Sequence, residues 1–311
     1  MPVNTSSPFL TIGTRGSPLA LAQANMTAAA LAQAAHVPID AIRIEIITTT
    51  GDATQDRPLS EIGGKGLFTK EIDLAQLEGR VDVAVHSAKD LPTVLPEGLI
   101  VAGYLPREDV RDALIAPRHK TLTALPQGAR VGTVSLRRQA LLKKLRPDLQ
   151  IEALRGNVQT RLNKAHSGEF DAVVLAMAGL KRLGLAHEVT EALDAERFLP
   201  AVGQGAIALA ARENDPRIQA LIDQIAHRET MIALLAERAF LHALDGSCRT
   251  PIAGNGVVTG GSIAFRGLVL SPDGTRSEAI SGEAPIAEAA ALGARLGQAV
   301  KAKLPPDFLK A

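Results

Sequence analysis

The order of segments over the first hundred residues constrains the fold of this chain more than any other feature of its sequence. Segments rich in β-branched and apolar residues alternate there with longer segments rich in Ala, Leu and Gln. The strand candidates are residues 9–14, 42–50, 81–86 and 99–104, and the helix candidates are residues 17–34 and 67–80. Strands that alternate with helices are typical of an α/β domain with a largely parallel sheet.

The same alternation restarts near residue 104 and predicts a second α/β domain of similar size. Its strand candidates are residues 112–116, 129–135, 149–156 and 170–179, and its helices begin at residues 136 and 157. The domain ends near the Pro- and Gly-containing segment 197–206. We expect the next segment, residues 206–213, to form a strand that returns to the first domain.

The character of the sequence changes again from about residue 228. An apolar-periodic helix at residues 229–244 is followed by strand candidates and a final helix, which is typical of a small α+β domain. We therefore predict two hinged α/β lobes that resemble type II periplasmic binding proteins, plus a small C-terminal α+β domain. The predicted boundaries are residues 1–104 with about 203–226 for the first lobe, 105–202 for the second, and 227–311 for the C-terminal domain.

Composition limits the classes of partner and site. Aromatic residues make up 3 % of the chain and Trp is absent, so we expect cores of Leu, Ile, Val and Ala. The formal net charge of +1 argues against a nucleic-acid binder that works through bulk positive charge. With one cysteine and no H-x-x-x-H pair, we expect neither a disulfide nor a metal site. We see no secretion signal, and the longest apolar run is shorter than a membrane span, so we expect a cytoplasmic protein without a membrane partner.

Arginines follow two of the predicted strands at the point where a helix begins. Arg15 precedes Ser17, which is placed to cap the first helix, and Arg155 and Gly156 occupy the matching turn of the second lobe. Arg161 lies one turn into the helix that follows. Ligands of open α/β sheets bind outside the carboxyl ends of strands, and the planar guanidinium of arginine suits carboxylates. These turns predict a ligand with several carboxylates or phosphates in a cleft between the lobes, although each is also explained as a capped turn with a surface arginine.

A third turn carries two arginines in the first turn of a predicted helix. Ser135 is placed to cap this helix, and Arg137 and Arg138 follow it. Cations there oppose the helix dipole by about 0.3–1 kcal/mol each, whereas the free N–H groups suit an anion. The arrangement predicts a docked anion, with two solvated arginines as the alternative. Arg182 lies in a last helical turn before Gly184, where a cation is stabilising in itself.

Two further features lie in turns. Ser87, Lys89 and Asp90 follow a short apolar strand, and Asp90 becomes the best candidate for an acidic catalytic group if the cleft binds anions. Cys248, the only cysteine, lies in a Gly/Ser/Arg/Pro-containing loop, where a small apolar filler fits poorly.

Nine motifs, in order, resemble those of the porphobilinogen deaminase (hydroxymethylbilane synthase) family. They are TRGSPLALAQ, GGKGLFTKE, VAVHSAKDLP, REDVRDALI, SLRRQALL, LRGNVQTRL, AGLKRLGL, LPAVGQGA and GSCRTPI. The resemblance runs from about Thr11 to the end of the cysteine loop and continues weakly through the last domain. Each motif alone is unspecific, and their shared order makes the resemblance specific.

This resemblance implies a transferase of haem and tetrapyrrole biosynthesis. The family joins four porphobilinogen molecules head to tail, releases ammonia from each, and hydrolyses off the linear tetrapyrrole hydroxymethylbilane. It works on a dipyrromethane cofactor held by a thioether, and Cys248 matches the cysteine that carries it. The resemblance further implies a monomer whose partners are porphobilinogen and the growing polypyrrole, and whose product passes to uroporphyrinogen-III synthase.

The resemblance also implies roles for the residues above. Asp90 matches the catalytic aspartate, which accepts pyrrole N–H bonds, stabilises the azafulvenium cation and moves protons. The implied cofactor-binding residues are Arg15, Ser17, Ser87, Lys89, Asp90, Thr133, Ser135, Arg137, Arg138, Arg155, Gly156 and Cys248. The implied substrate-binding residues are Arg15, Ser17, Arg155, Arg161 and Arg182. The loop Thr48–Gly66 matches a lid that excludes water, with Lys65 and Phe68 as weaker candidates, and Gln204 is a weaker candidate near the joint.

Two positions depart from the family pattern, and two other functions stay open. Val134 stands where the family often has serine, and Ser247 where glycine is common. The first alternative is a cleft-type solute-binding protein for polycarboxylate ligands, which needs neither Asp90 nor a loop thiol. The second is a cysteine hydrolase that uses Cys248 with His242 or His227, although no Cys-His-Asn pattern emerges.

Overall fold

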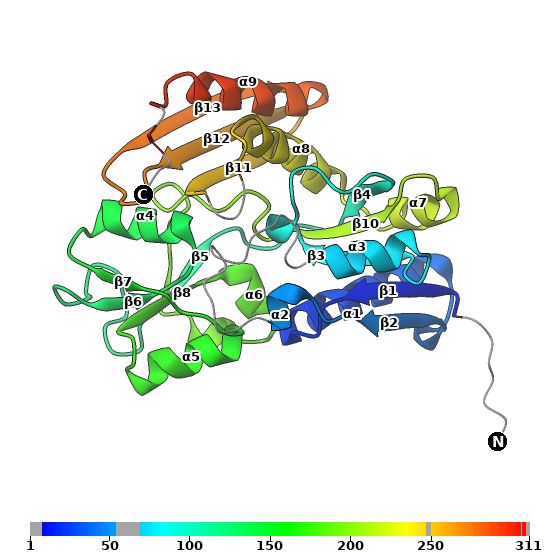
Figure 1. The fold of residues 1–311 in the computed structure, drawn as a ribbon, viewed down its shortest axis with the longest axis horizontal. Helices are drawn as coiled ribbons and strands as arrows, with labels where there is room; N and C mark the ends of the chain where they lie inside the picture. Colours follow the sequence, from blue (N-terminus) through cyan, green and yellow to red (C-terminus); the bar gives the residue numbers. More distant parts are fainter. Residues whose placement is uncertain (1–7, 54–68, 247–249, 306, 309–311) are drawn as a thin grey trace. The chain divides into compact units, whose positions relative to one another are not determined.

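The computed structural model describes residues 8–53, 69–246, 250–305 and 307–308 of the chain, which divides into two compact units (Figure 1). The first unit consists of Met1–Pro106 and Ile207–His227. The second consists of Arg107–Ala206 and Arg228–Ala311. The chain therefore leaves the first unit once and returns to it for a short segment.

The first unit is built on a mixed sheet. Its strands are β1 (Leu10–Thr14), β2 (Ile42–Ile46), β3 (Val83–Ser87), β4 (Leu99–Tyr104) and β10 (Ile207–Arg212). Within the described residues this sheet has five strands in the order β2-β1-β3-β10-β4. Strand β1 is parallel to β2 and β3, whereas β10 runs antiparallel between β3 and β4. The prediction that the segment after residue 206 returns to the first domain as a strand is confirmed.

Helices cover both faces of this sheet because successive strand residues point to opposite sides. The elements are α1 (Pro18–Ala35), η1 (Ile39–Ala41), α2 (Thr50–Ala53), α3 (Lys70–Leu77), η2 (Ala88–Asp90) and α7 (Pro216–Asp223). Val83 and Val85 of β3 pack in one cluster with apolar residues of α1 and α7. Ala84, between them, packs in another cluster with Ile72 and Ala75 of α3. Helix α7 was not predicted from the sequence.

The second unit contains a sheet with the same order of strand directions, but its antiparallel strand is the first of the sheet in the chain, whereas β10 is the last of the first sheet. Its strands are β5 (Asp112–Ile115), β6 (Arg130–Gly132), β7 (Gln150–Glu152), β8 (Ala172–Ala176) and β9 (Glu191–Ala192). The described residues give the strand order β7-β6-β8-β5-β9, with β6 parallel to β7 and β8, and β5 antiparallel to β8 and β9. In each sheet, the one strand that runs antiparallel to its neighbours lies next to an edge strand: β10 next to β4, and β5 next to β9. This confirms the predicted α/β class.

Helices also cover both faces of the second sheet. They are α4 (Leu136–Leu145), α5 (Val158–Ser167), α6 (Met177–Arg182) and η3 (Ala186–Glu188). Leu114 and Val174 pack with α4, whereas Ile115 and Val173 pack with α5 and α6. The predicted strand at residues 170–179 is shorter than expected, because β8 ends at Ala176 and the chain turns directly into α6.

The C-terminal part of the second unit is a sheet covered by two helices. Its elements are α8 (Arg228–Ala243), β11 (Ile252–Thr259), β12 (Ser262–Leu270), β13 (Ser277–Pro285), η4 (Ile286–Glu288) and α9 (Ala289–Lys301). The strands pair antiparallel in the order β11-β12-β13. Phe240 of α8 meets Phe265 of β12 with ring centroids 4.9 Å apart. A Cβ at Gly267 would lie 2.5 Å from the Phe240 ring, so the helix approaches the sheet where the side chain is absent. This α+β arrangement confirms the predicted class of the C-terminal part.

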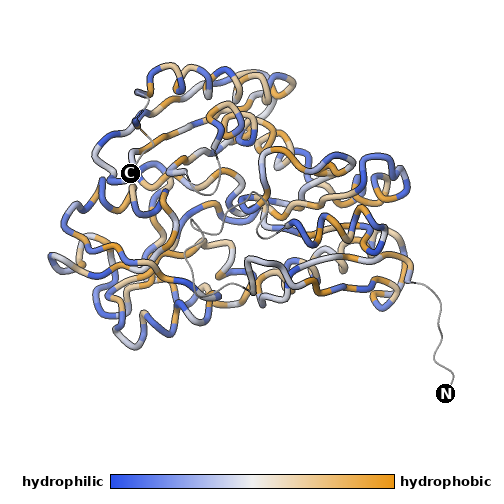
Figure 2. The backbone as a smooth tube through the Cα atoms, in the orientation of Figure 1, coloured by the Kyte–Doolittle hydropathy of each residue, from blue (hydrophilic) through white to orange (hydrophobic). Residues whose placement is uncertain are grey.

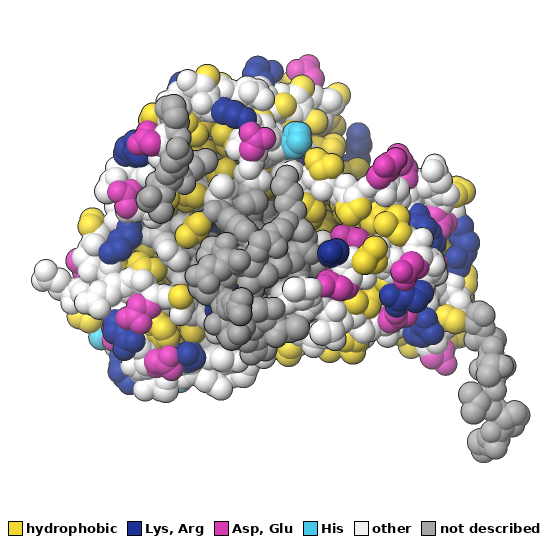
Figure 3. Space-filling model, viewed as in Figure 1, with side chains coloured by type: hydrophobic (Ala, Val, Ile, Leu, Met, Phe, Trp, Pro, Cys, Tyr) yellow, Lys and Arg dark blue, Asp and Glu magenta, His cyan; other side chains and the backbone are white. Residues whose placement is uncertain are grey.

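The surface is mixed in charge. Figure 2 shows hydrophobic and hydrophilic residues alternating along the elements, as expected where each element buries one face. On the face shown in Figure 3, acidic and basic side chains are interspersed. Among the described helices, none is both long enough and apolar enough to span a bilayer. The predicted three-domain boundaries stay a prediction.

Candidate functional site

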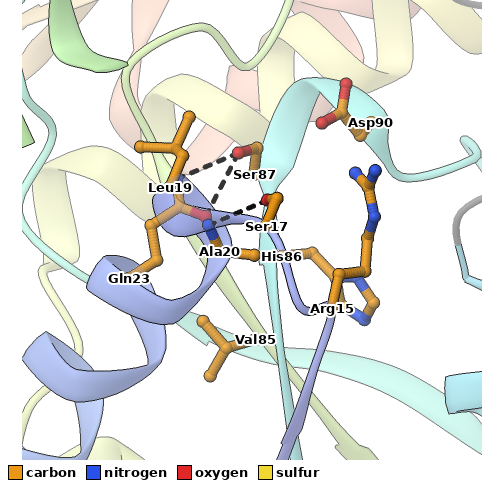
Figure 4. A pocket seen from close by; sticks show the side chains of 9 residues that line it. All are labelled: Arg15, Ser17, Leu19, Ala20, Gln23, Val85, His86, Ser87 and Asp90. Carbon is orange, nitrogen blue, oxygen red and sulfur yellow. Dashed lines mark hydrogen bonds between the residues drawn. The ribbon is translucent and has the colours of Figure 1, made fainter. Parts of the chain in front are cut away.

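The first unit contains a pocket at the carboxyl ends of β1 and β3. Its lining residues are Arg15, Ser17, Leu19, Ala20, Gln23, Val85, His86, Ser87 and Asp90 (Figure 4). Four of these, Arg15, Ser17, Ser87 and Asp90, were predicted as site residues from the sequence. The pocket therefore brings together side chains that are about 70 residues apart in the chain. Its position agrees with the rule that open α/β sheets bind ligands outside the carboxyl ends of their strands.

One wall of the pocket is the start of α1. Ser17 has an extended backbone and its Oγ accepts a hydrogen bond from the N–H of Ala20 at 3.3 Å, while Pro18 occupies the first helical position. This confirms the predicted cap, and it leaves backbone N–H groups and the positive end of the helix dipole at the pocket. Arg15 lies two residues before the cap and also lines the pocket, and Figure 4 shows its guanidinium extending toward Asp90. The wall is suited to an anion.

The opposite wall is the end of β3. Ser87 closes the strand, and its hydroxyl exchanges hydrogen bonds with the side-chain amide of Gln23 of α1 at 2.9 and 3.2 Å. The 3-10 turn η2 follows at once and carries Lys89 and Asp90. Asp90 is exposed and lines the pocket, so its carboxylate is open to a ligand. Lys89 is half-buried on the same turn and is not among the lining residues.

Sequence reasoning missed His86 and Gln23, which also line the pocket. Gln23 is buried and holds Ser87 in place. His86 is 5 % exposed, and burial together with the charge of Arg15 lowers its pKa to about 4. Its imidazole is therefore uncharged at neutral pH. The only sequence signal for His86 was its position between two predicted site segments, inside an otherwise apolar strand.

The two arginines at the start of α4 contact a carboxylate of the chain itself. Asp112, which is fully buried, accepts from Arg137 Nη2 at 2.7 Å and from Arg138 Nε and Nη2 at 2.9 and 2.7 Å. Arg137 and Arg138 are only 3 % and 6 % exposed, and burial lowers the pKa of Arg137. The burial of both arginines against Asp112 contradicts the alternative of two solvated arginines, whereas the docking of a ligand anion at this helix stays a prediction. Whether these arginines also bind the cofactor stays a prediction.

The sequence did not identify Asp112 as the partner of these arginines, because the residues that contact it are distant in the chain. Gln204 also reaches it, and donates Nε2 to Asp112 Oδ1 at 3.1 Å and to the carbonyl of Val110 at 2.8 Å. This polar cluster lies in the second unit, and Gln204 is 1 % exposed. The structure therefore gives Gln204, a weaker candidate from the sequence, a defined contact with Asp112.

The turn between β7 and α5 lies between two half-buried arginines, Arg155 and Arg161. Gly156 has a φ of 108°, and a Cβ there would meet the side chain of Thr160 at 2.7 Å, so glycine is required. Asn157, where the sequence predicted the helix to begin, caps α5 by accepting from the N–H of Thr160 at 2.9 Å. Arg155 is half-buried, and Arg161 Nε donates to the carbonyl of Gly156 at 2.9 Å. This turn and the first turn of α5 thus carry two half-buried arginines in one unit.

Three other predicted residues have structural contacts. Arg182 Nη2 donates to the carbonyl of Gly205 at 2.6 Å, and burial lowers its pKa. Thr133 is buried and accepts from the N–H of Ser135 at 3.2 Å. Ser135 caps α4 by accepting from the N–H of Arg138 at 3.4 Å, as the sequence predicted. Their roles toward a ligand stay predictions.

Several predicted positions lie outside the described residues. They are Lys65 and Phe68, most of the predicted lid Thr48–Gly66, and Ser247 and Cys248 in the cysteine loop. At the start of the predicted lid, the structure describes the short helix α2.

Comparison with known proteins covers most of the chain. A family model described as "Porphobilinogen deaminase, dipyromethane cofactor binding domain" matches residues 10–220. A second, described as "Porphobilinogen deaminase, C-terminal domain", matches residues 231–302. The second match corresponds to the described helices and strands from α8 to α9.

Curated relatives and solved structures add to this. A porphobilinogen deaminase of Nitrobacter hamburgensis is 55 % identical over 96 % of this chain and 94 % of its own length. A porphobilinogen deaminase of Nitrobacter winogradskyi is 58 % identical over 91 % of this chain and 90 % of its own length. A periplasmic binding protein of Salmonella typhimurium, described as having high arginine specificity, is 13 % identical over 71 % of this chain and 95 % of its own, with a TM-score of 0.39. The last likeness says nothing about what this chain binds, whereas the family matches and the two relatives show that the chain belongs to the porphobilinogen deaminase family.

Proposed function

We propose that this protein joins four porphobilinogen molecules head to tail on a dipyrromethane primer, releases ammonia at each addition, and hydrolyses off hydroxymethylbilane. The observation that carries the proposal is the pocket at the ends of β1 and β3, where the guanidinium of Arg15 and the capped start of α1 lie with the exposed carboxylate of Asp90. Family membership supplies the substrate. A solute-binding protein for polycarboxylates does not need a carboxylate such as Asp90 beside its anion-binding wall.

The residues present fit the cofactor that the family uses. A dipyrromethane built from two porphobilinogen units has four carboxylates and two pyrrole N–H groups. The pocket offers a guanidinium, a serine hydroxyl and helix N–H groups for carboxylates, and one carboxylate, Asp90, for N–H donors. Arg15, Ser17, Ser87, Lys89 and Asp90 would hold the group, with Cys248 as its covalent attachment. When bound, it supplies the pyrrole carbon to which the first substrate unit is joined.

At each addition, the aminomethyl C–N bond of the incoming substrate breaks and ammonia leaves. A C–C bond forms to the terminal pyrrole carbon, which then loses its proton. The loss of ammonia leaves positive charge on the incoming pyrrole, and the carboxylate of Asp90 stabilises this charge. Asp90 also accepts the pyrrole N–H and moves a proton at the leaving amine or the coupling carbon. Arg15 and Ser17 bind a substrate carboxylate and so orient the unit.

The arginines of the second unit bind further carboxylates in this proposal. We assign this binding to Arg155 and Arg161, which are both half-buried and lie on either side of the turn at Gly156. Arg182 binds a carboxylate through the guanidinium N–H groups that do not donate to the carbonyl of Gly205. Thr133, Ser135, Arg137 and Arg138 contribute as cofactor ligands, with both arginines oriented by Asp112.

Five further points belong to the proposal. The protein works as a monomer, acts in the cytoplasm, and its product is taken up by uroporphyrinogen-III synthase. Its chain forms three domains with the boundaries predicted from the sequence. Lys65 and Phe68 belong to a lid that excludes water.

Intact mass and ammonia release test the function together. The denatured protein should be heavier than the bare chain by two porphobilinogen units less two ammonias, and Cys248→Ser should lack this increment. If the purified protein has the bare mass, incubation with porphobilinogen should add the increment. A chain that neither carries nor gains it, and that releases no ammonia from porphobilinogen, would contradict the proposed function.

The catalytic assignment is tested by Asp90→Ala, with Asp40→Ala as the matched control. Asp40 is an exposed carboxylate of the same unit, in η1, away from the pocket. We expect Asp90→Ala to lower kcat by roughly 10²–10⁴-fold, the usual contribution of a positioned acid or base. Asp40→Ala should keep the wild-type rate. Wild-type turnover in Asp90→Ala would overturn the role of this carboxylate.

A further inference from the structure

His86 is a buried polar side chain at the pocket that the proposed function does not use. It lies on β3, lines the pocket and is 5 % exposed. Its Nε2 atom is buried and has no hydrogen-bond partner among the described residues. A buried polar atom left without a partner costs about 1–3 kcal/mol, so such atoms in native proteins call for a ligand, a water or another explanation.

The position of His86 on β3 places its ring at the pocket and not only in the apolar core. Its neighbours Val85 and Ser87 face α1, where Val85 belongs to the apolar core and Ser87 contacts Gln23. His86 points to the other side of the sheet, as Ala84 does. Its ring nevertheless reaches the pocket beyond the strand end, and Figure 4 shows it beside the side chain of Arg15.

The charge balance of the pocket suits an uncharged ring there. Its two charged residues are Arg15 and Asp90, one of each sign. Burial and the charge of Arg15 lower the pKa of His86 to about 4, so the ring adds no second positive charge at neutral pH. A neutral imidazole carries one N–H and can donate one hydrogen bond.

We propose that His86 is a further ligand-binding residue, whose Nε2–H donates to the same substrate carboxylate that Arg15 binds. This inference rests on the proposed function, because it assigns one carboxylate of porphobilinogen to the first unit. A carboxylate has two oxygens, so it accepts from a guanidinium and an imidazole at once. Arg15 supplies the positive charge, and the neutral ring of His86 supplies a second hydrogen bond that orients the carboxylate without adding another cation.

Two substitutions test the role in the holoenzyme. His86→Phe keeps a planar ring and removes both nitrogens, whereas His86→Gln keeps a side-chain N–H donor near the position of Nε2. A hydrogen bond to a charged group corresponds to roughly 10–100-fold in affinity, so His86→Phe should raise the KM for porphobilinogen by about that factor. Because the contact is made equally in the ground and transition states, kcat should change little. His86→Gln should bring KM back to within about threefold of the wild type.

His187→Phe is the matched control, because it makes the same chemical change at a histidine whose side chain is 70 % exposed in the second unit. It should leave KM unchanged. If His86→Phe has the KM of the wild type, His86 does not bind substrate and the inference is wrong. The same holds if His86→Gln is as impaired as His86→Phe, since loss of packing would then explain both.

A measurement on the wild-type protein keeps the test valid if His86→Phe does not fold. The probe is the analogue of porphobilinogen whose aminomethyl group is replaced by hydrogen, which keeps both carboxylates and has no leaving group. With 15N-labelled histidine, binding of this analogue should shift the His86 Nε2 resonance and raise the pKa of the ring, because a nearby anion favours its charged form. A saturating analogue that leaves both unchanged would overturn the inference.

The outcomes distinguish this inference from the proposed function. If wild-type protein releases no ammonia from porphobilinogen and gains no cofactor mass, the proposed function itself fails. If the wild type is active and His86 shows neither the KM effect nor the resonance shift, only the role of His86 fails.

Discussion

Asp112 and Arg138 form a buried ion pair in which Nε and Nη2 of Arg138 donate to one carboxylate oxygen at 2.9 and 2.7 Å. The second oxygen accepts from Arg137 at 2.7 Å, so a single carboxylate orients two guanidinium groups at the start of α4. Each arginine also donates to a backbone carbonyl, with Arg137 Nη1 at 2.7 Å from Leu199 O and Arg138 Nη1 at 3.0 Å from Val174 O. The cluster thus ties α4 to β5, β8 and the segment near residue 200.

Replacement of Asp112 by Asn should destabilise the second unit strongly. Two buried cations would lose their counter-charge, and removal of one partner of a buried ion pair typically costs about 3–5 kcal/mol. We expect a corresponding fall in the free energy of unfolding, measured by urea denaturation. Glu152→Gln is the control, because Glu152 pairs with Arg130 in the same sheet at a half-exposed position. A much smaller loss is expected there, and equal losses in the two variants would contradict the importance of burial.

Glu237 of α8 should be equally sensitive. It is fully buried and accepts from Arg107 Nη1 and Nη2 at 2.5 and 3.1 Å and from the N–H groups of Gly203 and Gly256 at 2.7 and 2.9 Å. Glu237→Ala leaves the charge of Arg107 and two backbone donors without partners. We expect a loss of about 3–5 kcal/mol, visible as a lower midpoint of thermal unfolding, whereas Glu283→Ala at an exposed position of β13 should behave like the wild type.

Asp73 of α3 makes stability depend on pH in an unusual direction. It is 4 % exposed, its Oδ1 has no partner among the described residues, and burial raises its pKa to about 6. The folded state therefore binds this proton more tightly than the unfolded chain does. The contribution of Asp73 to stability is fully present below the unfolded pKa of about 4 and is lost as pH rises through about 6.

The variant Asp73→Asn should remove this dependence. The stability of this variant relative to the wild type should rise between pH 4.5 and pH 8. The rise is on the order of 2–3 kcal/mol, because folding raises the pKa of Asp73 from 3.8 to about 6. Urea unfolding at four or five pH values measures the difference. A constant difference across this range would show that Asp73 is not held in a protonated form.

Truncation of Arg155 and of Arg138 should differ in its effect on stability. The side chain of Arg155 makes no hydrogen bond or ion pair with the described residues, whereas Arg138 is 6 % exposed and held by Asp112. We expect Arg155→Ala to leave the unfolding free energy within about 0.5 kcal/mol and to weaken binding of polypyrrole intermediates. Arg138→Ala should lower stability as well. If Arg155→Ala elongates the polypyrrole at the rate of the wild type, Arg155 is not a carboxylate ligand.

Much of the architecture was predictable because it depends on local sequence. The alternation of strand and helix segments follows from side-chain period and propensity, and the caps at Ser17, Ser135 and Asn157 need only a few neighbouring residues. For the same reason, four of the predicted site residues meet in one pocket, since they follow strands that end at the same edge. Helix α7 and the early end of β8 were missed, because short elements give weak periodic signals.

The sequence by itself determined the α/β class, the helix starts, the family motifs and the turns that carry arginines. Only the tertiary structure decided which polar groups are buried and which partners they meet. Asp112 contacts Arg137, Arg138 and Gln204 across 25, 26 and 92 positions, and the neutral state of His86 depends on burial beside Arg15. Such contacts between distant residues, and the exclusion of water that sets their charge, arise when the sheets and helices pack, and no local pattern of residues specifies them.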